Sequence, residues 1–76
     1  MIKEHDRIVL SKNLPTEGLL SGDVGTVVHI YNKGEAFEVE FMTLGGETVT
    51  VVTLPSSQIR AVGKRDIAHA RKLAIS

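Results

Sequence analysis

Alternating hydrophobic and polar residues run through most of the chain, and this period of two predicts β structure. The clearest alternation places Phe37, Val39 and Phe41 on one face of a strand. Glu38 and Glu40 then fall on the opposite face. Similar runs rich in Val, Ile and Thr, bounded by turn-forming residues, predict five strands. We expect these strands over residues 5–10, 24–31, 36–42, 47–54 and 59–62.

The connections between these strands differ in length and composition. The segment 11–23 is broken by proline and glycine and predicts a long loop. Residues 32–35 and the pair Gly45-Gly46 predict two tight turns, because Asn and Gly tolerate positive φ. Residues 55–58 begin with a proline, which cannot donate to a central strand, and they predict a single 3₁₀ turn.

The period changes at the C-terminus from two to between three and four. Ile67, Ala70, Leu73 and Ala74 recur at helical spacing, which predicts an amphipathic α-helix over about residues 64–74. A helix of this length is marginal alone in water. We therefore expect it to dock on the sheet or on another molecule.

This order of elements predicts a mostly β fold, namely a small five-stranded SH3-like barrel with a C-terminal α-helix. Closure of the sheet would hide its edges and enclose one core. A five-stranded OB-type barrel is the alternative, but it has longer strands and a helix within the strand order. The residues expected to form the core are Ile8, Leu10, Val27, Ile30, Phe37, Val39, Phe41, Val49, Val51, Leu54 and Ile59.

The composition of the 76 residues limits what such a fold can contain. Hydrophobic residues make up 42% of the chain, enough for one core in a single domain spanning residues 1–76. The sequence has no cysteine, which excludes disulfides and thiolate metal sites. Neither a secretory leader nor a membrane-spanning run of apolar residues is recognisable, so we expect a cytoplasmic protein without membrane contact.

The residues suited to catalysis or metal binding do not form a recognisable site. His5, His29 and His69 lie far apart in the sequence, and we expect neither a metal nor another cofactor. No serine stands in a nucleophile-elbow motif. Glu38 and Glu40 are expected on a solvated strand face, where both would be ionised and neither would supply a proton. The sequence therefore predicts a protein that is not an enzyme.

The run Gly22-Asp23-Val24-Gly25-Thr26-Val27-Val28 resembles the KOW motif of SH3-like barrels that bind RNA. The glycines and the apolar alternation of that motif are present, and we interpret Gly22 and Gly25 as residues required by the backbone geometry. Residues 18–31 contain no Lys or Arg, so the basic half of the motif is missing. Tyr31 is the one aromatic residue expected outside the core, which disfavours a base-stacking platform.

Charge is balanced overall but unevenly distributed, since nine basic residues match nine acidic ones. Residues 34–47 contain four acids and no base, whereas the chain from Arg60 onward contains five bases and one acid. One interpretation is that the two regions screen each other in solvent. The other is that they are separate patches that steer association with a partner or a second copy. The candidate contact residues are Tyr31, Glu38 and Glu40 on one patch, and Lys64, Arg65, Ile67, Arg71 and Lys72 on the other.

One further resemblance extends over nearly the whole chain and rests on the segments 6–10, 14–15, 22–28, 38–41, 46–49, 52–54 and 62–69. On these segments the chain resembles a family of small bacterial proteins, frequent in cyanobacteria, known as a domain of unknown function. The resemblance implies an SH3-like barrel without an established activity. Because some members are encoded beside toxin-like or nuclease genes, it also implies an antitoxin-like or accessory role.

We therefore expect a non-enzymatic protein-interaction or accessory module whose partner is a protein of unknown identity or a second copy. The alternative is a KOW-like nucleic-acid-binding module, which the zero net charge disfavours. Its phosphate contacts would come from the basic C-terminal residues Arg60, Lys64, Arg65, Arg71 and Lys72.

Overall fold

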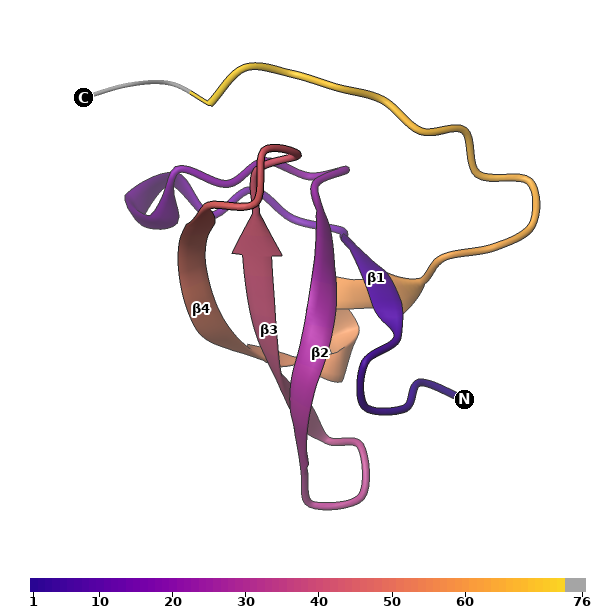
Figure 1. The fold of residues 1–76 in the computed structure, drawn as a ribbon. Coiled ribbons are helices and arrows are strands. Elements are labelled where there is room, and N and C mark those ends of the chain that lie inside the picture. Colours follow the sequence, from indigo (N-terminus) through magenta and orange to yellow (C-terminus); the bar gives the residue numbers. More distant parts are fainter. Residues whose placement is uncertain (74–76) are drawn as a thin grey trace.

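The computed structural model describes residues 1–73 and contains five β-strands in one antiparallel sheet (Figure 1). This confirms the mostly β fold class. The strands are β1 (Arg7–Leu10), β2 (Val24–Tyr31), β3 (Ala36–Met42), β4 (Thr48–Pro55) and β5 (Ile59–Ala61). Two 3₁₀ turns complete the elements, η1 (Pro15–Glu17) and η2 (Ser56–Gln58).

The strand order is β4-β3-β2-β1-β5, which leaves β4 and β5 as the two edges of the sheet. Among the described residues no ladder joins these edges, so the predicted closure into a barrel is wrong. Instead, the loop between β1 and β2 lies against both edges. Glu17 accepts a hydrogen bond from Thr50 of β4, and Ser11 donates to the carbonyl of Gln58 just before β5. The loop thus reaches the two edges through single hydrogen bonds, at Thr50 and at Gln58, without forming a ladder with either strand.

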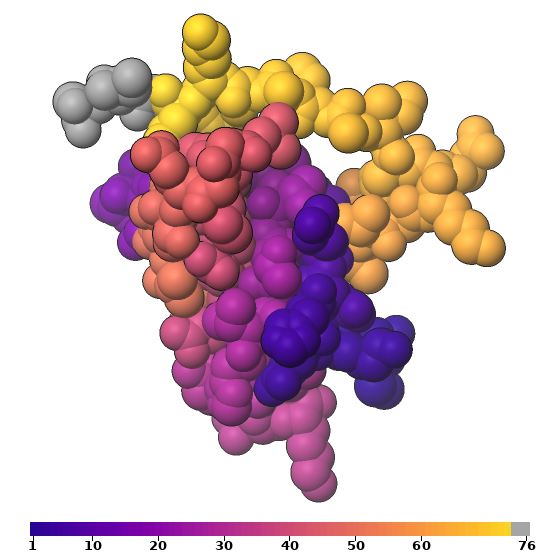
Figure 2. All heavy atoms as spheres, in the orientation of Figure 1, coloured from indigo at the N-terminus to yellow at the C-terminus, as the bar shows by residue number. Residues whose placement is uncertain are grey.

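The predicted C-terminal helix is also wrong for residues 64–73: Lys64 and Arg65 form a turn and residues 66–73 have no regular secondary structure, while Ala74 lies outside the described residues. We call residues 62–73 the C-terminal arm; it is the orange-to-yellow segment that crosses one end of the molecule (Figures 1 and 2). A short helix gains little in water without tertiary contacts. Here Asp66 and Arg71 form ion pairs with residues outside the arm, which hold the arm in place.

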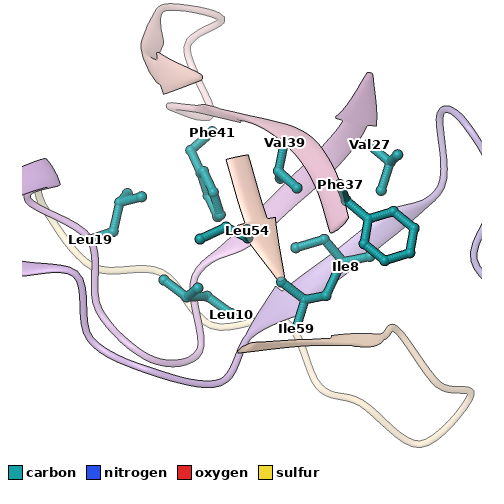
Figure 3. Close-up of a cluster of buried hydrophobic side chains, with 9 residues drawn as sticks. All are labelled: Ile8, Leu10, Leu19, Val27, Phe37, Val39, Phe41, Leu54 and Ile59. Atoms are coloured by element: carbon teal, nitrogen blue, oxygen red, sulfur yellow. The ribbon is translucent and has the colours of Figure 1, made fainter. Parts of the chain in front are cut away.

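The core lies on the concave side of the curved sheet and includes one residue from the loop between β1 and β2 (Figure 3). Leu19 was not predicted in the core, yet it is buried there from this loop. The buried residues of the core are Ile8, Leu10, Leu19, Val27, Phe37, Val39, Phe41, Leu54 and Ile59. Of the other predicted core residues, Ile30 and Val49 are partly buried against this cluster.

Val51 does not belong to the core, contrary to the prediction, and is 44% exposed. The reason is an irregularity between β3 and β4: Phe41 pairs with Thr50 but Met42 pairs with Thr48, so Val49 is an extra residue. Such a bulge shifts the alternation by one position. Beyond it, Val52 and Leu54 face inward and Val51 faces solvent.

The strand ends differ slightly from the predicted ranges at three places. β1 begins at Arg7 because His5 has a positive φ of 74° and belongs to a turn. β4 is shifted by one residue and includes Pro55, which an edge strand tolerates. β5 ends at Ala61, one residue earlier than predicted. The ranges of β2 and β3 coincide with the predicted ones.

Candidate functional site

Tyr31 and Glu38 lie together on the outer face of β2 and β3. The Tyr31 hydroxyl donates a hydrogen bond to Glu38 Oε1 over 2.9 Å. The His29 ring meets the Tyr31 ring edge-on, with centroids 4.4 Å apart. The bond to Glu38 raises the pKa of Tyr31, because the carboxylate accepts from the protonated phenol; burial and the charge of Glu38 act in the same direction. These side chains form one ordered polar cluster on the sheet.

Glu40 makes no hydrogen bond to this cluster within residues 1–73, although it lies two residues from Glu38 along the same strand. Its Oε2 accepts a hydrogen bond of 2.6 Å from the Thr48 hydroxyl of β4. It also lines a groove that runs beneath the C-terminal arm, whereas Tyr31 and Glu38 do not. The predicted acidic patch is therefore divided between two places on the surface.

This groove separates the C-terminal arm from the outer face of the sheet and from the neighbouring loops, and has a volume of about 1400 Å³. The arm covers it by crossing the end of the molecule that carries the turn between β3 and β4 (Figure 2). Val9 lies on the sheet side of the groove and is nearly buried. The exposed apolar side chains that line the groove are Leu20, Val24, Met42, Leu44, Val62, Ile67 and Leu73.

The beginning of the arm is fixed by a two-pronged ion pair between Arg60 of β5 and Asp66. The guanidinium nitrogens donate to the two Asp66 oxygens over 2.8 and 2.9 Å. The backbone N–H of Gly63 donates to the same carboxylate over 2.6 Å. The bonds from Arg60, followed by the one from Gly63, lower the pKa of Asp66 to about 2.

The far end of the arm is fixed by a second two-pronged ion pair, between Arg71 and Asp23 in the turn before β2. Arg71 Nε and Nη2 donate to the carboxylate over 2.9 and 2.7 Å, and Nη2 also donates to the Gly18 carbonyl over 3.0 Å. Partial burial raises the pKa of Asp23. The hydrogen bonds from Arg71 and from the Leu20 N–H outweigh it and leave the pKa below its ordinary value.

The predicted basic residues are thus divided into two groups. Arg60 and Arg71 are used within the molecule as anchors of the arm. Lys64, Arg65 and Lys72 are exposed, and within residues 1–73 none of them forms an ion pair. Ile67, at 90% exposed, stands between the two anchors. The structure therefore brings an exposed apolar residue and three unpaired cations together on one arm.

The sequence interpretation did not identify Asp23 and Asp66 as anchors, or Val24, Met42 and Leu44 as groove residues. One local signal was available, since Leu44 is a large apolar residue directly before the Gly45-Gly46 turn. The pairing of Arg71 with Asp23 gives no local signal, because the two residues are 48 positions apart.

Residues 1–73 contain no group of three or more acidic or histidine side chains positioned to hold a metal ion. In the same residues, none of the helical segments has the length and apolar character needed to span a bilayer.

The Arg60–Asp66 pair predicts a specific dependence on pH. An unperturbed Asp has a pKa of about 3.9, and that of Asp66 is about 2. A lowered carboxyl pKa means that the stabilisation by the pair is fully present above the unperturbed value and is lost as the pH falls through the folded one. We expect the Asp66 carboxyl carbon, followed by NMR, to titrate near the lower value.

The variant Arg60→Gln provides the control for this titration. It removes the charge and the paired donors but leaves the Gly63 N–H in place. We expect the midpoint of Asp66 to move up toward the ordinary value. A wild-type midpoint already at that ordinary value would contradict the anchoring of the arm by this pair.

Comparison with known proteins gives one match. The model of a family described as Domain of unknown function (DUF4926) matches residues 4–61. The searches of curated proteins and of solved structures found no match. The matched range begins before β1 and ends with β5, so the segment 62–69, on which the sequence resemblance also relied, lies outside it. Because the match covers well over half of the chain, this protein belongs to the DUF4926 family of domains of unknown function.

Proposed function

We propose that the chain is a non-enzymatic protein-interaction module that binds an acidic protein partner through the C-terminal arm and the groove beneath it. One observation carries this proposal. The arm presents Ile67, at 90% exposed, over a groove lined by further exposed apolar side chains. Contiguous exposed apolar surface of this kind is typical of a binding site.

The arm is suited to folding on binding. Its apolar residues recur at helical spacing, although in the isolated chain the arm is not helical. Contact with a partner would supply the apolar surface that an amphipathic helix needs. The Arg60–Asp66 pair is partly exposed, with side chains 53% and 32% accessible, whereas the Arg71–Asp23 pair is more covered, at 28% and 18%. Partly exposed pairs contribute little to stability, so a partner can displace the Arg60–Asp66 pair first.

The charge of the arm favours an acidic partner. Lys64, Arg65 and Lys72 have no ion pair within the described residues, and they lie on both sides of Ile67. A cationic rim around an apolar centre steers an acidic surface toward the arm and penalises a basic one. We propose that this interaction occurs in the cytoplasm and that it serves an antitoxin-like or accessory role toward the product of a neighbouring gene.

Affinity capture from the native host tests this proposal when wild type is compared with surface variants. Ile67→Asp places a charge in the apolar centre of the arm, and the double variant Lys64→Glu with Arg65→Glu reverses its rim. We expect both to lose the captured protein. Val28→Asp, at an exposed position of β2 that does not line the groove, is the matched control and should retain it. Equal capture by wild type and Ile67→Asp would refute the proposal.

A measurement of binding to generic RNA and DNA separates the proposed function from the KOW-like alternative. Nucleic-acid binding depends on phosphate contacts and falls steeply with salt. We expect generic RNA and DNA to show no binding even at low ionic strength, because two of the basic residues, Arg60 and Arg71, are neutralised by Asp66 and Asp23. Binding that a nuclease abolishes would favour the alternative instead.

A further inference from the structure

We infer that the outer edge of β4 is a self-association site, at which two copies of the chain pair their β4 strands antiparallel. This surface lies apart from the arm and goes beyond the function proposed above. β4 ends the sheet on one side, and Figure 1 shows it at the edge of the ribbon. A second copy would extend the sheet from one molecule into the next.

The backbone groups needed for this pairing are identified by the register of β3 and β4. Ser56 donates to the Glu35 carbonyl, so these opposed residues form a hydrogen-bonded pair. Since such pairs alternate along an antiparallel ladder, Leu54 and Val52 also bond to β3. The N–H and C=O groups of Val51 and Thr53 must then point away from β3. No hydrogen bond formed by the described residues outside the strand ladders involves these backbone groups.

The composition of β4 favours pairing with itself. Its sequence Thr-Val-Thr-Val-Val-Thr-Leu-Pro contains no charged residue and is dominated by β-branched side chains. Edge strands that must remain single usually carry a lysine, an inward charge or a proline within the strand. In β4 the proline is the last residue and the bulge lies at Val49. Among the described residues, the loop between β1 and β2 is hydrogen-bonded to β4 only through the Thr50 side chain, so the stretch 51–54 has none of these protections.

Geometry selects one register for the dimer. A two-fold axis at Val52 sets Val51 of one copy opposite Thr53 of the other, and these are the residues whose backbone groups point outward. Side chains of paired residues lie on the same face, so Val51 would contact Thr53 on the outer face and Val52 would contact Val52 on the inner face. The ladder ends where Pro55 lacks an N–H and the bulge at Val49 begins.

A second copy fits better than continued strand addition. An isologous β4–β4 contact uses the same edge on both molecules and is closed after two copies. The opposite edge, β5, has only three residues and carries Arg60. It therefore provides too short a strand for β4 of another copy to pair with, which disfavours head-to-tail addition of further copies. The register also brings no like charges together, because Glu47 comes opposite Ser57. The area is small, and a small interface indicates a weak, concentration-dependent dimer.

Sedimentation equilibrium over a wide concentration range tests this inference. We expect the average mass of the wild type to rise from the monomer value of 8.2 kDa toward twice that value and no further. Val51→Pro removes an outward N–H that occurs at two symmetric places in the dimer. An edge strand tolerates proline at such a position. We expect it to weaken association by about ten-fold or more.

The opposite edge provides a matched control. Val62 donates to the Arg7 carbonyl, so by alternation Ala61 also directs its N–H away from the sheet. Ala61→Pro introduces the same residue at an equivalent edge position and should associate like wild type. Val51→Lys places a charge on the exposed side chain of this edge, which disfavours pairing, and should stay monomeric. It decides the result if Val51→Pro does not fold. A wild type that stays monomeric, grows beyond a dimer, or is unaffected by either Val51 variant would overturn the inference.

Discussion

Replacing Phe41 by alanine is expected to remove most of the free energy of unfolding of the chain. Phe41 is 2% exposed and belongs to the central cluster of the core (Figure 3). Its ring lies against Gly25 of β2, where an added Cβ would come within 2.9 Å of Cε1. Truncation of a buried phenylalanine to alanine costs about 3–5 kcal/mol, because the lost transfer energy is joined by the cost of a cavity. A chain of this size has a total stability at the low end of the range for native proteins, about 5 kcal/mol.

Met42→Ala is the matched control for this substitution, since Met42 follows Phe41 on β3 but is exposed. We expect its free energy of unfolding to fall by less than about 1 kcal/mol, as is usual at the surface. Urea unfolding followed by far-UV circular dichroism measures both variants. A Phe41→Ala protein that keeps the cooperative transition and midpoint of the wild type would contradict the position of Phe41 in the core.

Local patterns predicted β2 and β3 because each signal lies within the element itself. The alternation of Phe37, Val39 and Phe41 selects the inward face of β3, and the turn before it uses Asn32 and Lys33, both of which have positive φ. Such preferences do not depend on which strands become neighbours. The ranges predicted for β2 and β3 therefore agree with those in the structure.

Closure of the sheet and the state of the C-terminal segment depend on distant partners instead. The loop that carries Leu19 adds this side chain to the core and reaches both edges of the sheet through single hydrogen bonds. Nothing in the local sequence of the loop indicates these distant partners. The helical periodicity of Ile67 and Leu73 is real, yet Arg71 pairs with Asp23, 48 positions earlier in the chain. For a segment with so little intrinsic helix stability, two such tertiary contacts decide the outcome.

The candidate site shows the same division. Sequence reasoning grouped Tyr31 with Glu38, and the structure joins them by a hydrogen bond because they lie on one face of adjacent strands. It also selected Arg71 as a contact for a partner, whereas the structure uses that side chain to hold the arm. Whether a surface charge is available depends on its neighbours in space, which the local sequence does not specify.

Gly25 illustrates how the structure changes the reason for a residue that the sequence correctly singled out. The KOW-like pattern indicated that both Gly22 and Gly25 serve the backbone geometry. This is confirmed for Gly22, which has a φ of 99°. Gly25 is not among the residues with positive φ. A Cβ built there would lie 2.5 Å from Val39 Cγ1 and 2.9 Å from Phe41 Cε1, so Gly25 is required for space against β3.

Gly25→Ala is therefore expected to destabilise the domain by about 1–3 kcal/mol, the usual cost of overpacking a well-packed core. Gly45→Ala is the control, because its nearest neighbour, Thr43 Oγ1, is 3.8 Å away and its φ is not positive. It should change the free energy of unfolding by less than about 0.5 kcal/mol.

A double-mutant cycle with Val39→Ala distinguishes this steric explanation from a backbone one. Val39→Ala removes the methyl group nearest to the added Cβ, so the two substitutions together should cost less than the sum of their separate effects. Gly22→Ala, where nothing lies within 4 Å of the added Cβ, should be destabilising through its φ alone and additive with Val39→Ala. Additivity of Gly25→Ala with Val39→Ala would show that crowding against β3 is not the reason for glycine at this position.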